Sequence, residues 1–354
     1  MTHCCKYAAR GSTDRAEVWR RAEVKQAARG SADRAEVWRR AEPHCYVKIN
    51  ILYNNMSKCY TMNHKKRRQN ALLWEKNGDM NVVLGVDIGG STTKIVALNE
   101  KKECIATLQV KAADQITALY GAIGNLLYSN RISFDQVRKI VLTGVGSSQV
   151  EGGSIYDIPS CKVNEFEAIG HSGLIMSGLD ETLVISMGTG TAFVHARNDV
   201  YEHIGGSGVG GGTLIGLATK MLGESDVTAV AELAKGGDVT KVDLGINEIS
   251  NTDTTALPSY VTASNFGKIK NNVTNADIAL GILNMVYQTA GMLAVFACRN
   301  TDIKTIVATG SVATLPQAEE LLGAVGDLCG VKFIIPKEAQ YATAIGAASL
   351  RFDD

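Results

Sequence analysis

The stretch LGVDIGGSTTKIVAL, residues 84–98, decides the fold of this chain. An apolar strand ends at Asp87, a turn rich in glycine and hydroxyl side chains follows, and a second apolar strand resumes at Lys94. Adjacent glycines let a backbone approach a polyanion closely, while the hydroxyl and turn N–H groups supply hydrogen-bond donors. Asp87, at the strand end, is placed to hold a hydrated Mg²⁺. The stretch therefore predicts a nucleotide phosphate site in a strand-turn-strand unit.

Two further glycine-rich segments decide between this interpretation and an ordinary β-hairpin, which the same turn residues also suit. Gly188-Thr189-Gly190-Thr191 separates predicted strands over residues 183–187 and 192–195. Residues 205–213, GGSGVGGGT, precede a helix predicted from Leu214. Three such loops in this order favour phosphate binding.

The third loop also matches the dinucleotide fingerprint, as Gly206-x-Gly208-x-x-Gly211. We discount that match, because the loop lies in no repeated βαβ unit and no acidic residue ends a second strand at the expected distance. The helix that follows can still bind phosphate through its free N–H groups and its dipole.

Charge is distributed unevenly along this chain of 354 residues, whose net charge is zero. Residues 1–79 hold 17 Lys and Arg against 8 Asp and Glu, and residues 80–354 hold 19 against 28. The basic leader contains an imperfect repeat, residues 8–23 and 27–42. We expect residues 1–79 to be disordered or non-native, with Met80 as a candidate natural start. The remainder is long enough for two lobes.

Several function classes are not supported by the sequence. The N-terminus lacks an uncharged apolar run, and no stretch of about twenty apolar residues exists, so we expect a cytoplasmic protein with no membrane partner. The cysteines form no C-x-x-C pair and no Cys/His cluster, which favours reduced thiols over zinc ligands. The basic run Lys65–Arg68 is typical of a solvated face, and we expect no nucleic-acid partner.

Hydrophobic periodicity predicts the same order of elements twice. In the first half, strands are expected over 82–87, 94–98, 104–111 and 139–143, with helices over 116–127 and 165–176, the latter capped by Asn164. The second half has predicted strands over 183–187, 192–195, 305–308 and 332–335, a core helix over 275–298 and a closing helix over 341–351.

This duplicated α/β plan, with a phosphate turn between the first two strands of each half, resembles the acetate kinase/sugar kinase/Hsp70/actin superfamily. The resemblance covers nearly all of residues 80–352. It implies a two-lobed actin-like ATPase fold made of duplicated ribonuclease H-like βββαβα domains, with nucleotide in the interlobe cleft. The expected lobes are residues 80–181 and 182–354.

The segment VNEFEAIGHSGL, residues 163–174, narrows the resemblance. Together with the three glycine loops and the insert ASNFG, residues 263–267, it looks like a type II pantothenate kinase. That resemblance implies a homodimer that uses ATP and Mg²⁺ to convert pantothenate to 4'-phosphopantothenate, the first step of coenzyme A biosynthesis. Glu165 matches the general base. A Glu at a helix start more often complements the helix dipole, but its place in the motif pattern favours the catalytic role.

The resemblance also assigns the binding residues. Asp87 would position Mg²⁺, Lys94 would contact phosphate, and Ser311 would lie near the adenosine, in the turn formed by residues 308–311. The β- and γ-phosphates would be wrapped by Gly89, Gly90, Ser91, Thr92 and Thr93. The nucleotide would also be held by Thr189, Gly211, Gly212, Thr213, Leu214 and Ile215.

The substrate residues contain one departure from the family. Thr191 and position 203 are assigned to substrate, but the family has an Arg where this chain has His203. A histidine is shorter and only partly charged at neutral pH, so it cannot copy a two-pronged Arg grip. We hypothesise that Arg197, on the neighbouring strand, substitutes for it.

Two alternatives stay open. The first is a sugar kinase of the same superfamily, of the N-acetylhexosamine type; such enzymes generally use an Asp as base. The second is an ATPase that activates or regulates a partner enzyme; activators of radical dehydratases need a cluster-binding cysteine pair. Acceptor choice and iron content separate these alternatives from a pantothenate kinase.

Overall fold

The computed structural model describes residues 81–354, apart from 112–113, 152, 250–260 and 270–271. By contacts the chain divides into two compact units, Met1–Gly78 and Asp79–Asp354. The described residues belong to the second unit. The predicted leader, residues 1–79, and the candidate start at Met80 lie outside them.

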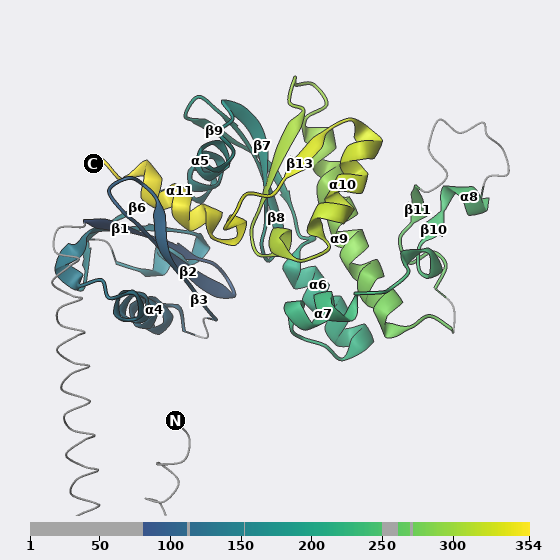
Figure 1. Ribbon diagram of the computed structural model, residues 1–354, viewed down its shortest axis with the longest axis horizontal. Coiled ribbons are helices and arrows are strands. Elements are labelled where there is room, and N and C mark those ends of the chain that lie inside the picture. The colour runs from purple at the N-terminus through teal and green to yellow at the C-terminus, as the bar shows by residue number, and fades with distance from the viewer. Residues whose placement is uncertain (1–80, 112–113, 152, 250–260, 270–271) are drawn as a thin grey trace, which may run out of the picture. The chain divides into compact units, whose positions relative to one another are not determined.

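Two mixed sheets form the framework of the second unit (Figure 1). The first has six strands in the order β3-β2-β1-β4-β6-β5, and the second has five in the order β13-β12-β7-β8-β9. The strands of the first sheet are β1 (Val82–Ile88), β2 (Thr92–Leu98), β3 (Cys104–Lys111), β4 (Val137–Thr143), β5 (Gly153–Ile155) and β6 (Ile158–Lys162). Those of the second are β7 (Glu181–Met187), β8 (Thr191–Arg197), β9 (Val200–Ser207), β12 (Thr305–Thr309) and β13 (Lys332–Ile334).

The two sheets repeat one topology. In the first, β1 pairs antiparallel with β2 and β2 with β3, while β1 pairs parallel with β4 and β4 with β6. In the second, β7, β8 and β9 form the antiparallel part, and β12 and β13 extend it in parallel. The sequence-predicted duplication is therefore present in the strand order itself.

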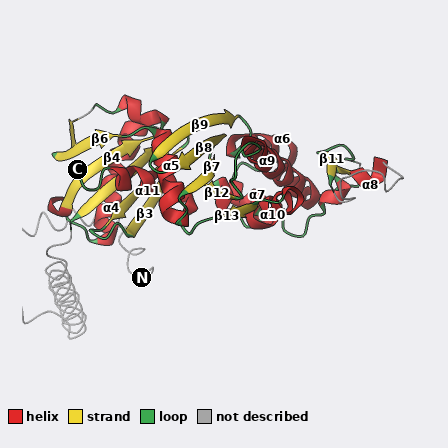
Figure 2. Cartoon of the chain, turned by 90° about the horizontal axis from the view of Figure 1, so that it is seen from above, coloured by secondary structure: helices red, strands yellow, loops and turns green. Residues whose placement is uncertain are grey.

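Helices cover the faces of both sheets (Figure 2). The larger ones are α4 (Gln115–Asn130), α5 (Glu165–Ser177), α6 (Gly211–Leu222), α9 (Asn275–Ala297), α10 (Ala318–Cys329) and α11 (Ala342–Leu350). Shorter elements follow α6: α7 (Val227–Leu233), α8 (Ile246–Ile249) and the two-stranded pair β10 (Leu244–Gly245) and β11 (Thr262–Ser264). Helix α4 packs on β2 and β3, α11 on β1, β2 and β4, and α5 on β7, β8 and β9.

The alternation of strand β1 places one set of side chains on each face of the first sheet. Val82, Leu84 and Val86 belong to the core under α4, and Val83 belongs to the core under α11. A Cβ at Gly85 would overlap the carbonyl oxygen of Ala344, so glycine is what lets α11 lie directly on the strand. The sequence prediction of a closely packed closing helix is confirmed.

Helix α9 is the predicted core helix of the second half. Its side chains Ile282, Leu283, Val286 and Tyr287 are fully buried in one cluster with the inner face of β7. By length and hydropathy alone α9 could cross a membrane, but more than half of its most apolar window is buried within the protein. Its apolar surface is therefore used in the core.

Some elements differ from the sequence predictions. Strand β9 begins at Val200 and extends through Gly205 and Gly206, so the third glycine loop starts later than its composition indicates. Helix α6 begins at Gly211 instead of Leu214, because small residues there let it pack against the second turn. Helix α10 and the β5–β6 hairpin were not predicted.

Candidate functional site

The turn between β1 and β2 closes tightly. The N–H of Gly89 donates to the carbonyl of Thr92 at 3.0 Å, and Gly90 and Ser91 are exposed. Thr93 pairs with Ile88, and residues directly opposite share a face, so its buried hydroxyl lies on the α4 side. The turn thus offers the main chain and Ser91 to solvent, whereas the side chain of Thr93 is directed away from the Asp87 face.

Asp87 and Lys94 lie directly opposite each other on β1 and β2. Lys94 is 8% exposed, and Asp87 is half-buried. Burial raises the pKa of Asp87 and lowers the pKa of Lys94, and in each case the charge of the partner opposes the shift. The face of the sheet toward α11 therefore carries a negative and a positive group in a poorly solvated position.

Thr143 and Gly144, at the end of β4, complete this face and were missed by the sequence analysis. Thr143 pairs with Asp87, and its buried hydroxyl oxygen has no hydrogen-bond partner. Gly144 has a φ of +86°, and a Cβ there would lie 2.6 Å from the Asp87 Oδ1 atom and from the Ile88 carbonyl oxygen. The available signal was a Thr-Gly pair after an apolar strand, which the sequence repeats at Thr309-Gly310.

Glu165 comes to this face from a different element. It is the first residue of α5, which is capped by the Asn164 side chain accepting from the N–H groups of Phe166 and Glu167 at 2.8 and 3.4 Å. The pKa of Glu165 is raised, first by burial and then by the charge of Asp87. The two carboxylates are thus electrostatically coupled, although 78 residues separate them in sequence.

The second and third glycine loops are bonded to each other. The N–H groups of Gly211 and Gly212 donate to the carbonyls of Gly188 and Thr189, each at 2.8 Å. The Thr191 hydroxyl donates to the Val209 carbonyl at 2.9 Å. The sequence predicts free N–H groups at the start of this helix, but two of them are engaged within the protein.

The remaining nucleotide candidates differ in access. Thr213 is half-buried and its hydroxyl donates to the Gly208 carbonyl at 2.9 Å, while Ile215 is exposed. Leu214 is fully buried in the core, so its side chain cannot line a ligand site. Ser311 is half-buried in the turn after β12, next to Val312, which a Cβ on Gly211 would approach within 3.1 Å. The turn of Ser311 and the start of α6 therefore lie together.

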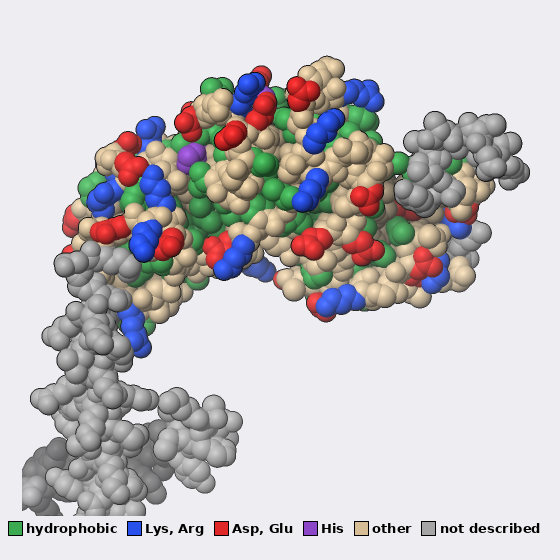
Figure 3. Space-filling view, turned by 45° about the horizontal axis from the view of Figure 1, so that its top comes forward, with side chains coloured by type: hydrophobic (Ala, Val, Ile, Leu, Met, Phe, Trp, Pro, Cys, Tyr) green, Lys and Arg blue, Asp and Glu red, His purple; other side chains and the backbone are tan. Residues whose placement is uncertain are grey.

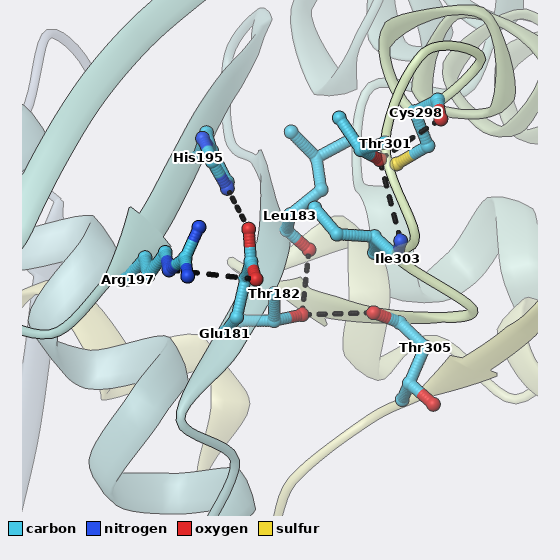
Figure 4. Close-up of polar contacts among 9 residues, drawn as sticks. All are labelled: Glu181, Thr182, Leu183, His195, Arg197, Cys298, Thr301, Ile303 and Thr305. Carbon is cyan, nitrogen blue, oxygen red and sulfur yellow. Dashed lines mark hydrogen bonds and ion pairs between the residues drawn. The ribbon is translucent and has the colours of Figure 1, made fainter.

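The two basic substrate candidates, His203 and Arg197, lie in different places. His203 on β9 stacks on Phe166, with ring centroids 3.8 Å apart and an interplanar angle of 10°. Arg197 lies at the far end of β8 from the second turn, with its Nε atom 3.7 Å from the carboxylate of Glu181, which also bonds His195 (Figure 4). The structure therefore brings His203, and not Arg197, next to the start of α5.

The residues on the Asp87 face fit a phosphate and a hydrated cation. Buried polar groups normally have a partner, so the unpaired Thr143 hydroxyl indicates a place for a polar ligand. Lys94 supplies positive charge for phosphate, and Asp87 supplies one carboxylate oxygen ligand. Among the described residues no cluster of three His, Cys, Asp or Glu is present. One carboxylate with water and phosphate ligands is an ordinary coordination for Mg²⁺.

Comparison with known proteins agrees with this geometry. Residues 181–320 match the family named Fumble. A type II pantothenate kinase of Bacillus thuringiensis is 28% identical over 240 residues, which are 66% of this chain and 83% of the relative. The enzyme of the same name from Oceanobacillus iheyensis is 28% identical over 241 residues, 65% of this chain and 84% of the relative. The resemblance to the type II pantothenate kinases is confirmed.

Solved structures support the fold. The activator of 2-hydroxyisocaproyl-CoA dehydratase from Clostridium difficile superposes with a TM-score of 0.57 at 18% identity, over 77% of this chain and 94% of that one. A ROK family glucokinase from Streptomyces griseus gives a TM-score of 0.51 at 13% identity, over 77% of this chain and its full length. The chain thus has an α/β actin-like ATPase fold with two lobes.

Proposed function

We propose that this protein transfers the γ-phosphoryl group of ATP to the terminal hydroxyl of pantothenate, with Glu165 as the general base. The product would be 4'-phosphopantothenate, and the reaction would open coenzyme A biosynthesis. The observation that carries the proposal is the start of α5. There Glu165 is coupled to Asp87 of the first sheet, and the next residue, Phe166, stacks on His203 of the second.

The chemistry needs a carboxylate that accepts a proton from a hydroxyl while phosphate charge is neutralised nearby. The raised pKa of Glu165 makes its ionised form a stronger base. Lys94 would neutralise a phosphate oxygen, and the exposed main chain of Gly90 and Ser91, in the turn that Gly89 closes, would orient it. A hydrated Mg²⁺, when bound, would supply further charge neutralisation, and Asp87 would hold it.

The second lobe would hold the rest of the nucleotide. The bonds that join the loops at Gly188 and Gly211 fix their main chains, so the exposed Thr189 and Ile215 would line a rigid edge. Ser311 would lie near the adenosine. His203 would face the substrate. Thr191, which is 3% exposed and whose hydroxyl donates to the Val209 carbonyl, would support the substrate site from within the protein. We propose the division into lobes of residues 80–181 and 182–354, with α11 returning to the first sheet.

A small-molecule substrate fits the surface better than a nucleic acid does. Acidic and basic side chains are interspersed over the face in Figure 3, and residues 80–354 carry more acidic than basic groups. Electrostatic binding of nucleic acid needs clustered basic side chains. We further propose that the protein is cytoplasmic and forms a homodimer. Light scattering on the purified protein tests the homodimer.

The experiment compares ADP release from the full chain with pantothenate, with N-acetylglucosamine and without acceptor. We expect turnover only with pantothenate. Glu165→Gln should lower kcat on the order of 10²–10⁴-fold, the usual contribution of a general base. Glu167→Gln is the matched control, because it makes the same change at an exposed position two residues along the helix. Equal losses in both variants would overturn the assignment of the base.

The same assay decides between the alternatives. Turnover with the sugar alone would indicate a sugar kinase, and equal turnover without acceptor would indicate a regulatory ATPase. Iron content of anaerobically purified protein tests the activator class. Within the described residues Cys104, Cys161, Cys298 and Cys329 are free thiols, and burial raises the pKa of Cys104 to about 12 and of Cys298 to about 11, which opposes metal binding as thiolates.

A further inference from the structure

Strand β9 packs against α5 through a row of contacts that begins beside Glu165. His203 stacks on Phe166, and two residues earlier on the same face of the strand Tyr201 lies against Gly170. A Cβ at Gly170 would lie 2.6 Å from the Tyr201 Cδ1 atom, so the Tyr201 ring packs directly on the helix where glycine leaves room for it. The position of α5 is therefore tied to the position of β9.

A chain of polar contacts continues from the Tyr201 ring. Its hydroxyl lies 2.8 Å from Nδ1 of His171 on α5 and 3.1 Å from Oδ1 of Asp199. Nε2 of His171 lies 3.1 Å from the Ser349 hydroxyl oxygen on α11. Three elements, α11, α5 and the start of β9, thus meet at one imidazole.

The direction of these hydrogen bonds follows from what each group can donate. The Asp199 carboxylate can only accept a hydrogen bond, so the Tyr201 hydroxyl donates its hydrogen to Asp199. Nδ1 of His171 must then carry the hydrogen that it shares with the Tyr201 oxygen. In a neutral imidazole Nε2 is left as acceptor, and the Ser349 hydroxyl donates to it.

The surroundings favour the neutral ring. Burial is the main cause that lowers the pKa of His171; Asp199 opposes that shift and Lys102 adds to it. Burial and Asp199 raise the pKa of Tyr201, which keeps its hydroxyl protonated. The charged groups that line the recess around the ring, whose volume is about 740 Å³, are Lys102, Glu167, Asp199 and Arg351.

We propose that His171 and Tyr201 are positioning residues that set the start of α5, and with it Glu165, against β9. Neither touches a reacting atom. The chain from Ser349 to Asp199 holds His171 as its Nδ1–H tautomer and fixes how α5 meets the strand that carries His203. The inference rests on the proposed function only where Glu165 acts as base; the tautomer is a property of the folded protein itself.

The first test is ¹⁵N NMR of the histidine rings in the full chain at neutral pH. We expect His171, assigned by its loss in His171→Asn, to be neutral and protonated on Nδ1. In Tyr201→Phe the Nδ1–H tautomer should lose its preference, because its acceptor is gone. A neutral Nε2–H ring in the unaltered protein would overturn the proposal, whether or not the protein is a pantothenate kinase.

The second test measures kinetics. Tyr201→Phe keeps the ring against Gly170 and removes only the hydroxyl, so we expect kcat to fall on the order of tenfold while the KM for ATP stays unchanged. Tyr156→Phe is the control, since it removes a hydroxyl that donates from the β5–β6 turn to the Tyr120 carbonyl of α4 at 3.1 Å. Equal kcat in the two variants would overturn the positioning role. Absence of turnover in the unaltered protein would overturn the proposed function and leave the NMR test to decide the tautomer.

Discussion

The two sheets share a topology but differ in the chemistry at their equivalent turns. In the first, Asp87 is paired with Lys94 across the turn and with Thr143 on the parallel strand. In the second, the same three positions hold Ser186, Ala192 and Thr309. The two sheets are therefore similar frameworks, but at these positions only the first carries charged side chains, Asp87 and Lys94.

The hydroxyls show the same difference. Thr143 has no hydrogen-bond partner, whereas the Thr309 hydroxyl donates to the Ile185 carbonyl at 3.3 Å. A satisfied hydroxyl adds to local rigidity, and an unsatisfied one leaves a hydrogen-bonding group for water or a bound molecule. The first sheet is thus equipped for reacting groups, and the second is equipped to hold a fixed shape.

The largest expected effect on turnover comes from removing the negative charge of Asp87. Asp87→Asn should lower pantothenate-dependent ADP release on the order of 10²–10³-fold, the range for loss of one electrostatic group in an active site. Ser186→Ala, at the equivalent position of the second sheet, should change turnover less than tenfold. Similar losses in both would break the comparison between the sheets.

The glycines that follow the parallel strands offer a test of stability. Gly144 and Gly310 have φ values of +86° and +92°, and a Cβ on either would collide with the adjacent first strand, at Ile88 or at Met187. Gly144→Ala and Gly310→Ala should each lower the free energy of unfolding by about 1–3 kcal/mol. Thermal unfolding measures both. Gly144→Ala should in addition lose activity beyond its loss of stability, because the new methyl group contacts Asp87 Oδ1.

A smaller effect is expected in the pH dependence of stability. Because the pKa of Glu165 is raised in the folded state, this carboxyl favours the folded protein at acid pH and loses that contribution as pH rises through its folded pKa. Glu165→Gln should therefore raise Tm relative to the unaltered protein at pH 7, with a smaller gain near pH 4. Glu167→Gln, at an exposed position of the same helix, is the control variant. A gain in Tm that is constant with pH would contradict the burial of Glu165.

The smallest expected effect is that of Arg197→Ala. The Arg197 side chain is 62% exposed and pairs with Glu181, and such surface pairs contribute about 0–1 kcal/mol. We expect the pantothenate KM and kcat to change less than twofold. His203→Arg should instead lower that KM, because a guanidinium can keep the stack on Phe166 and grip a carboxylate with two donors. A large effect of Arg197→Ala would restore it as the substitute for the family's Arg.

Local patterns predicted much of this fold. Alternating apolar residues identified β1, β2 and β3, and Asn164 correctly marked the start of α5. The short β5–β6 hairpin has weak patterning, and its turn depends on positive φ values at Tyr156 and Asp157, which are not typical turn glycines. Helix α10 was missed because Gly323 and Gly326 lower the helix propensity of this short amphipathic segment.

The candidate site was predicted less completely, for a physical reason. Sequence motifs locate residues on one segment, as with Asp87 and Lys94, but not the partner that another segment provides. Gly144 contributes only by lacking a side chain beside Asp87, and the engagement of the Gly211 and Gly212 N–H groups depends on a second loop. Arg197 was proposed as a substrate residue because it lies on the strand next to His203. It is the last residue of β8, and so it lies at the opposite end of that strand from the second turn.

The position of α11 has a consequence for synthesis of the protein. Strand β1 is among the first elements of its unit to leave the ribosome, and the helix that covers one of its faces is the last. Until α11 has been synthesised, Val83, Val96 and Val141 have no cover from Ala344 and Ala348. A chain that stops short of residue 342 would expose this apolar face, and such faces are what chaperones and proteases act on. The first lobe is therefore completed only after the strands and helices of the second have been synthesised.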